Sequence, residues 1–236
     1  MTGADRTTAI GPQAYAAWRA TSLGALTERL EQGLMLDLLG GQAGARILDI
    51  GCGDGALVRA LAARGAAAVG VDPDPAMLAV ARKRAAEADI PATFLEGRAE
   101  SLPFPDASFD AVTAMTVLCF VPDAKGAVRE MARVLRPGGR LVLGELGRWS
   151  FWAARRRLRG WLGSPTWKAA RFRDAAELRQ LAEAAGLKVA ATRGAIFYPP
   201  IGWAARLMAP FDARLGRRAT IGAAFIALAA TRPKAP

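Results

Sequence analysis

The residues with the clearest chemical potential lie in a turn near position 50. Gly51, Gly53 and Gly55 occupy alternate positions there, directly after an apolar stretch that is typical of a strand. Glycine has no Cβ, so a turn of this kind lets backbone N–H groups approach a polar ligand closely. Asp72 follows Gly51 by 21 positions, at the expected end of the next strand. A carboxylate in that place accepts hydrogen bonds from ribose hydroxyls, so the spacing predicts a site for a nucleoside-containing molecule.

The segments that must position these residues alternate between strand and helix. We expect strands at residues 46–50, 67–71, 92–96, 109–115, 140–144, 187–198 and 220–231. We expect two helices within residues 12–39 and further helices at residues 57–65, 75–88, 124–135 and 174–185. Alternation of this kind predicts an α/β fold with a Rossmann-like, seven-stranded, mostly parallel sheet that carries helices on both faces.

We expect the 236 residues to form one domain with a helical cap, because this length suits one large α/β domain. Residues 1–40 would supply N-terminal cap helices, and residues 41–145 the cofactor-binding core. Two insertions, at residues 146–173 and 199–217, would complete the cap.

Charge is distributed unevenly along the chain. The formal net charge of +11 combines −2 in residues 1–145 with +13 in residues 146–236. Residues 146–173 hold eight basic and no acidic residues, together with four of the six tryptophans. This asymmetry indicates a nearly neutral half that holds the site and a basic, aromatic half that faces an anionic partner or substrate. A solvated, arginine-rich face would give the same composition.

The chain contains no His and only two Cys, which excludes several kinds of site. A Ser-His-Asp or Cys-His triad cannot form within it, and we expect no metal site and no disulfide framework. No apolar run approaches the roughly 20 residues that a membrane-spanning helix needs, and no signal core is visible. We therefore expect a cytoplasmic protein, with peripheral contact to an anionic membrane as the alternative.

The glycine turn allows two interpretations. Residues 51–56 satisfy the G-x-G-x-x-G/A pattern of dinucleotide-binding proteins, so an NAD(P) site is one of them. However, the run ILDIGCGDG at residues 47–55 resembles motif I of the class I S-adenosylmethionine-dependent methyltransferases. Three further blocks resemble that family in order and spacing: VGVD followed by Met77-Leu78, AESLPFPD followed by SFD, and VLRPGG. The resemblance, to the group called methyltransferase type 11, is firm over residues 44–145.

This resemblance implies S-adenosyl-L-methionine as the methyl donor and S-adenosyl-L-homocysteine as the product. Asp49 resembles the acidic residue that orders the glycine turn and reaches toward the methionine amino group, and Asp72 resembles the ribose ligand. The residues that would line the cofactor are Tyr15, Asp49, Gly51, Cys52, Gly53, Gly55, Asp72, Pro73, Met77, Arg98, Ala99, Glu100, Met115 and Thr116. Arg98 departs from the pattern, because many members have Asp there, and Glu100 is the alternative contact with adenine. For Asp72 the alternative role is a cap on the next helix.

Methyl transfer from a sulfonium is an in-line displacement, and it needs a base only where the acceptor must lose a proton. In a chain without His, the candidates for that base are Glu145, Tyr15 and Tyr198, with Asp123 and Cys119 as weaker ones. Glu145 lies at the carboxyl end of the expected fifth strand, where α/β sheets bind ligands. The alternative for Glu145 is a structural role, as a helix cap or as the ion-pair partner of Arg148.

The cap is expected to contact the acceptor. Its candidate contacts are aromatic, namely Trp18, Phe120, Trp149, Trp152 and Trp161. Together with the arginines they favour a small, hydrophobic or anionic-amphiphilic acceptor. The same composition suits an amphipathic helix on an anionic membrane, with a lipid or quinone acceptor. A nucleic-acid acceptor is disfavoured because no Asn/Asp-Pro-Pro-Tyr motif follows the fourth strand, and a non-catalytic, cofactor-binding module is the remaining alternative. The acceptor atom stays open between O, N, S and C.

Overall fold

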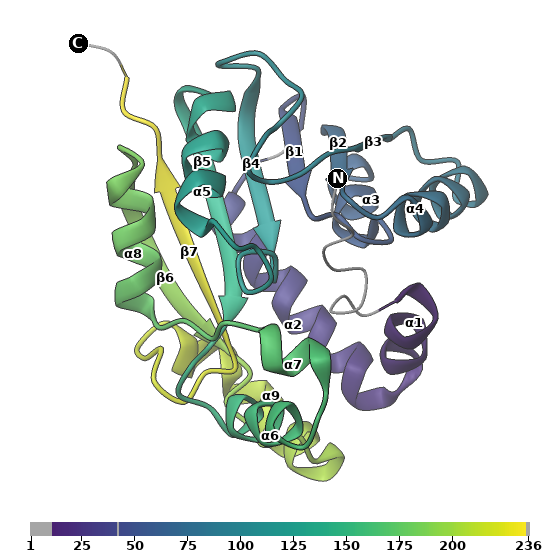
Figure 1. The fold of residues 1–236 in the computed structure, drawn as a ribbon, viewed down its shortest axis with the longest axis vertical. Helices are drawn as coiled ribbons and strands as arrows, with labels where there is room; N and C mark the ends of the chain where they lie inside the picture. The colour runs from purple at the N-terminus through teal and green to yellow at the C-terminus, as the bar shows by residue number, and fades with distance from the viewer. Residues whose placement is uncertain (1–10, 42, 235–236) are drawn as a thin grey trace.

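The computed structural model describes residues 11–41 and 43–234, so residues 1–10 of the expected N-terminal cap lie outside the described part. Its centre is a seven-stranded sheet in the order β3-β2-β1-β4-β5-β7-β6 (Figure 1). The strands are β1 (Arg46–Ile50), β2 (Ala67–Asp72), β3 (Thr93–Glu96), β4 (Phe109–Met115), β5 (Leu135–Leu146), β6 (Lys188–Ala195) and β7 (Phe225–Thr231). All neighbouring strands are parallel except β7, which runs antiparallel to both β5 and β6. The predicted α/β class and seven-stranded, mostly parallel sheet are confirmed.

Helices cover both faces of the sheet. One face carries α2 (Ser22–Leu39), α3 (Ala56–Ala62), α4 (Pro75–Glu87) and α9 (Gly202–Gly216), and the other carries α5 (Ala124–Val134) and α8 (Ala175–Ala184). Side chains alternate between these two layers because successive residues of a strand point to opposite faces. On β7, for example, Phe225 packs in the α2 layer and Ile226 in the α5 layer. The helix pair within residues 12–39 is confirmed as α1 (Pro12–Ala20) and α2.

Several strand boundaries differ from the prediction, and the seventh strand begins at Phe225 rather than at residue 220. The sixth strand ends at Ala195 rather than at residue 198, because Ile196 takes a positive φ of 65° and leaves the extended conformation. The backbone N–H groups of Ile196 and Phe197 then donate to the carboxylate of Asp212 on α9, at 2.8 and 2.9 Å. The Asp212 carboxylate therefore takes the place of a neighbouring strand as the hydrogen-bond acceptor for these two N–H groups. The fifth strand also begins earlier than predicted, at Leu135.

The cap gathers at the carboxyl ends of the parallel strands. The arrows of β4 and β5 point toward the end of the molecule where α1, α6 (Phe151–Trp161), α7 (Pro165–Ala169) and α9 lie (Figure 1). Ligands of open α/β sheets bind at this end of the strands. No described helix combines the length and apolar character that crossing a membrane requires.

Candidate functional site

The turn after β1 depends on its glycines for two different reasons. Gly51, Gly53 and Gly55 have φ values of 64°, 53° and 74°, in the region that side chains other than glycine rarely adopt. A Cβ on Gly51 would lie 2.5 Å from Val117, and one on Gly55 would lie 2.8 Å from the ring of Phe94. A Cβ on Gly53 would meet nothing within 4 Å. The outer two glycines therefore allow close packing, whereas Gly53 borders open space.

Asp72, the last residue of β2, holds this turn in place. Its Oδ2 accepts a hydrogen bond from the Gly53 N–H at 2.8 Å, and its Oδ1 accepts one from the Asp74 N–H at 2.9 Å. The capping alternative applies to Asp74, whose side chain accepts from the N–H of Ala76 at the start of α4. Burial raises the pKa of Asp72, and its two backbone hydrogen bonds oppose that rise. Each carboxylate oxygen keeps a lone pair for a further donor.

Asp49 lies one strand away and is buried within the sheet. Its Oδ1 accepts a hydrogen bond from the Thr113 hydroxyl on β4 at 2.7 Å. Burial and, to a smaller extent, the nearby carboxylate of Asp72 raise the pKa of Asp49 to about 7, against the hydrogen bond from Thr113. Such a carboxylate gains stability from a cationic ligand, because a positive charge offsets the cost of its burial.

The bend after β4 faces the glycine turn and is held by Glu145. Thr116 has a φ of 58°, which is strained for a β-branched residue. Glu145 Oε1 accepts from the N–H groups of Val117 and Leu118, at 3.1 and 2.7 Å, and so fixes the two residues that follow the strained one. Glu145 Oε2 is sealed from solvent and has no partner among the described residues. This geometry gives Glu145 a positioning role and denies it access to an acceptor as a base.

The ion pair predicted as the alternative role of Glu145, with Arg148, does not form. Arg148 pairs instead with Glu177 at 2.6 Å and with Asp174 at 3.6 Å, at the start of α8. The cation that acts on Glu145 is the buried Arg173, which donates to the Leu118 carbonyl at 2.8 Å. Burial raises the pKa of Glu145 to about 7, and Arg173 opposes the rise.

The N-terminal helix α1 is joined to the glycine turn by an ion-pair network. Arg19 forms ion pairs with Asp54 of the turn and, at 2.6 Å, with Glu28 of α2. Arg84 of α4 pairs with the same Asp54 carboxylate. The Arg19 guanidinium also covers the ring of Tyr15, 5.1 Å from its centre. The sequence carried no signal for this network, because its residues come from four separate segments of a chain with 27 arginines.

The family is decided by comparison with known proteins. A family model described as a methyltransferase domain matches residues 48–143. A ubiquinone biosynthesis O-methyltransferase from Idiomarina loihiensis is 37% identical over 172 residues, which cover 69% of this chain and 70% of the relative. This chain belongs to the class I S-adenosylmethionine-dependent methyltransferases. It is therefore an enzyme whose methyl donor is S-adenosylmethionine, as the motifs predict.

Two further similarities agree with this family. A demethylmenaquinone methyltransferase from Tropheryma whipplei is 44% identical over 109 residues, which cover 46% of this chain and 44% of that relative. Among solved structures, an S-adenosylmethionine-dependent methyltransferase from Thermotoga maritima superimposes with a TM-score of 0.71. It is 27% identical, and the match covers 93% of this methyltransferase and 95% of that chain.

The residues around the glycine turn fit S-adenosylmethionine. Asp72 offers a carboxylate already oriented by two backbone amides, Gly53 leaves space beside it, and Asp49 offers a buried carboxylate to a cation. When bound, this group would supply an electrophilic methyl group on a sulfonium. Around the same end of the sheet lie the exposed Pro73 and the buried Met77.

Of the remaining predicted cofactor residues, Cys52 is turned away from the open space. Its Sγ is buried against Gly70 of β2, where an added Cβ would lie 2.8 Å from it, and burial raises the pKa of the thiol. Arg98 and Glu100 flank the buried Ala99 after β3, and Arg98 Nε lies 3.9 Å from Glu100 Oε2. Met115 is the last residue of β4, and Thr116 follows it directly.

The other predicted bases are poorly suited to accept a proton. Burial raises the pKa of Tyr15, and it raises that of Tyr198 to about 12, so both phenols stay protonated near neutral pH. The Tyr198 hydroxyl lies 3.2 Å from the Thr27 hydroxyl on α2. Asp123 caps α5 by accepting from the Gly126 N–H, and Cys119 is a buried thiol that donates to the Thr116 carbonyl.

The predicted acceptor residues separate into buried and exposed groups. Trp152 is buried, and its Nε1 donates to the Tyr198 carbonyl at 2.9 Å. Trp18 stacks on Tyr15 in α1, with ring centres 6.1 Å apart. Phe120, Trp149 and Trp161 are exposed, and Trp161 is the most exposed of them at 85%. The tryptophans of residues 146–173 therefore do not form one continuous lid.

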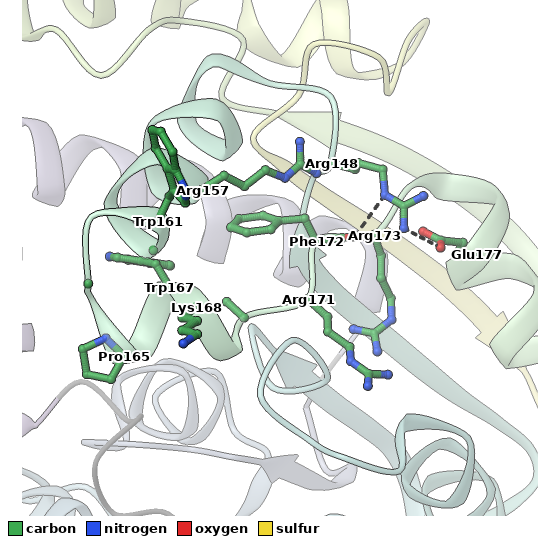
Figure 2. Close-up of a pocket in the computed structure, with 13 residues that line it drawn as sticks. Arg148, Arg157, Trp161, Pro165, Trp167, Lys168, Arg171, Phe172, Arg173 and Glu177 are labelled. Carbon is green, nitrogen blue, oxygen red and sulfur yellow. Dashed lines mark hydrogen bonds and ion pairs between the residues drawn. The ribbon is translucent and has the colours of Figure 1, made fainter.

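A basic groove of about 990 Å³ lies between α6, α7 and the segment that leads into α8. Figure 2 shows Trp161, Pro165 and Trp167 on one side of it and the chain from Arg171 to Arg173 on the other. Arg148 lines the groove, and its guanidinium points toward Glu177, whose carboxylate neutralises part of the charge. Exposed cations such as Arg171 leave the groove positive.

Proposed function

We propose that this methyltransferase binds S-adenosylmethionine across the glycine turn, with the ribose hydroxyls on Asp72 and the methionine amino group toward Asp49. The observation that carries this assignment is the hydrogen bond from Gly53 to Asp72, because it fixes a buried carboxylate beside open space. Residues 98–100 would border the adenine, and Met115 the methionine part. Positioning then supplies much of the acceleration, since well-oriented reactants reach effective molarities of about 10⁵ M or more.

We propose that the acceptor is a small, hydrophobic or anionic-amphiphilic molecule that binds beside α6 and α7. Trp152 and Trp167 give this side an apolar wall, and Arg156 adds a positive charge between them. The names of the two curated relatives concern ubiquinone biosynthesis and demethylmenaquinone, and these names support a small-molecule acceptor.

Incubation with methyl-labelled S-adenosylmethionine and a metabolite extract tests this proposal. We expect label in low-molecular-weight products that partition into organic solvent. Label confined to RNA or protein, or no label from a protein that binds the cofactor, would overturn it.

We propose in addition that the end formed by α6 and α9 contacts an anionic membrane. On α9, Trp203, Leu207 and Phe211 are 71%, 66% and 56% exposed, and their spacing of four places them on one face. Exposed Trp161 and Leu162 extend the apolar surface at the end of α6. Exposed arginines accompany these residues on both helices, namely Arg155, Arg157, Arg159, Arg206 and Arg214. Arginine beside exposed Trp, Leu and Phe is the composition of a peripheral membrane surface.

A further inference from the structure

The groove between α6, α7 and the segment that leads into α8 carries three cationic side chains without an anionic partner. They are Arg157 on α6, Lys168 on α7 and Arg171 after α7 (Figure 2). All three residues are exposed, and within the described part of the chain none of their side chains forms an ion pair or a hydrogen bond. Because like charges repel one another, such a groove is more stable when it holds an anion.

The other charged residues that line the groove already have partners. Arg148 donates to the carboxylate of Glu177 at 2.6 Å and to the carbonyl of Phe172 at 3.2 Å. Glu177 is the one acidic residue among the described residues of the lining. Arg173 is buried and donates to the Leu118 carbonyl at 2.8 Å. The three unpaired cations are therefore the ones that a ligand would meet.

Aromatic rings stand beside these cations. The Arg157 guanidinium lies 5.1 Å from the ring centre of Phe172, whose face stabilises its charge but does not accept its in-plane N–H bonds. Trp161 is 85% exposed at the end of α6, and Trp167 lines the same groove. A Cβ on Gly160 would lie 2.8 Å from the backbone of Trp167, so α6 and α7 pack closely at this wall. The groove thus offers apolar rings and free N–H donors together.

The chain after β4 connects this groove to the glycine turn. The Arg171 N–H donates to the Cys119 carbonyl at 2.9 Å. Cys119 lies two residues after Val117, whose side chain would be 2.5 Å from a Cβ on Gly51. Two residues span at most about 7 Å. A molecule held in the groove can therefore extend toward the place where we propose that the cofactor binds.

A phosphate group matches this set of cations better than a carboxylate does. A phosphate monoester carries a charge of about −1.5 to −2 at neutral pH and presents three strong acceptor oxygens. Guanidinium groups bind such oxygens through pairs of parallel hydrogen bonds. A carboxylate carries a single charge and has only two oxygens, so it would leave more of the positive charge uncompensated.

We propose that the groove binds the phosphate group of a phosphorylated, amphiphilic methyl acceptor. Arg157, Lys168 and Arg171 neutralise the phosphate, and Trp161 packs against the apolar body of the molecule. This assignment rests on the proposed function and names the class of its substrate.

Binding of 1-naphthyl phosphate to the full chain, saturated with S-adenosylhomocysteine, tests the groove without any turnover. Calorimetry in about 0.15 M salt, where distant surface charges are screened, compares this probe with 1-naphthol, its uncharged match. We expect 1-naphthyl phosphate to bind at least about tenfold more tightly, because hydrogen bonds between charged groups are strong. Equal affinity of the wild type for the two probes would overturn the proposal.

Single substitutions then locate the probe. Lys168→Met and Arg171→Met should each weaken the binding of 1-naphthyl phosphate about fivefold, as expected for an exposed charge. Trp161→Ala should weaken it by a similar factor of about five, through the loss of ring stacking. Arg159→Met, an exposed arginine of α6 that does not line the groove, should leave the affinity unchanged. Equal effects of Arg171→Met and Arg159→Met would overturn the proposal.

The labelled product of the metabolite extract tests the substrate class. An anion-exchange resin should retain the product, and treatment with a phosphatase should release it. A labelled small molecule that the resin does not retain, or that the phosphatase does not alter, would overturn this inference and leave the proposed function standing. A wild type that labels no small molecule would contradict the proposed function itself.

Vesicles of phosphatidylglycerol distinguish a soluble phosphate ester from the headgroup of a membrane lipid. We expect Lys168→Met and Arg171→Met to weaken 1-naphthyl phosphate binding in the absence of any vesicle. Vesicle binding that depends on these two residues, from a protein that does not bind 1-naphthyl phosphate, would overturn the proposal by assigning the groove to the membrane.

Discussion

Arg19 of α1 forms an ion pair with Asp54 of the glycine turn. Asp54 is 4% exposed, so this pair lies largely out of solvent, where the loss of one partner leaves an uncompensated charge. Arg19 also bonds Glu28 of α2 and covers Tyr15, so one side chain sets the place of α1 over the turn. The N-terminal helix is thereby joined to the glycine turn, beside which we propose that the cofactor binds.

Arg19→Met is therefore expected to weaken the binding of S-adenosylhomocysteine about tenfold, or about 1.4 kcal/mol. The reason is that α1 and the glycine turn would no longer hold one another in place. Isothermal titration calorimetry gives the affinity, with Arg29→Met, an exposed arginine on α2, as the control. Equal affinities for the two variants would show that the ion pair does not support the site.

Glu145 is expected to make the stability of the protein depend on pH. Its pKa rises from 4.5 to about 7 on folding, so the native state holds more protons than the unfolded chain between these values. The free energy of unfolding must then fall as the pH rises through that window. Asp49 and Glu31 act in the same direction. Glu145→Gln should remove roughly 1–3 kcal/mol of that fall.

Urea unfolding at pH 5 and pH 8 measures this effect. Glu96→Gln, an exposed carboxylate on β3, serves as the control and should leave the pH dependence as in the wild type. A Glu145→Gln variant with an unaltered pH dependence would contradict the burial of this carboxylate.

The exposed apolar face of α9 is expected to bind vesicles. Trp203→Glu combined with Leu207→Glu should abolish co-sedimentation with vesicles of anionic lipid, because two charges would have to enter the apolar boundary. Leu95→Glu is the control, since Leu95 is exposed on β3, at the opposite edge of the sheet from α9. Absence of wild-type binding even at low salt, or binding unaffected by the double variant, would remove the membrane proposal.

Much of the fold could be predicted from the sequence because it rests on local patterns. The strand before Gly51, the glycine turn and Asp72 are adjacent or separated by one helix, and their hydrogen bonds join neighbouring strands. The helix boundaries follow from caps that the sequence displays, such as Asp74 before α4 and Asp174 before α8.

The roles of individual charged and aromatic side chains could not be predicted in the same way. The place of Glu145 at a strand end makes it a candidate base in the sequence, whereas the structure shows its carboxylate bound to the backbone amides of Val117 and Leu118. Trp152 and Trp161 lie at the two ends of the same arginine-rich helix, yet one is buried and the other is 85% exposed. Which of them is buried depends on which face of α6 packs against the rest of the chain, and the amino-acid composition does not predict that.

The affinity of Asp72→Ala for S-adenosylhomocysteine is the most direct test of the account, with Asp74→Ala as its matched control. Both residues lie at the same turn and accept backbone hydrogen bonds, but only Asp72 joins the glycine turn. Calorimetry on the full chain should show a loss of about 100-fold or more for Asp72→Ala, equivalent to about 2.7 kcal/mol, and a change of less than about threefold for Asp74→Ala. Wild-type affinity in Asp72→Ala, or an equal loss in both variants, would contradict the placement of the cofactor beside the glycine turn.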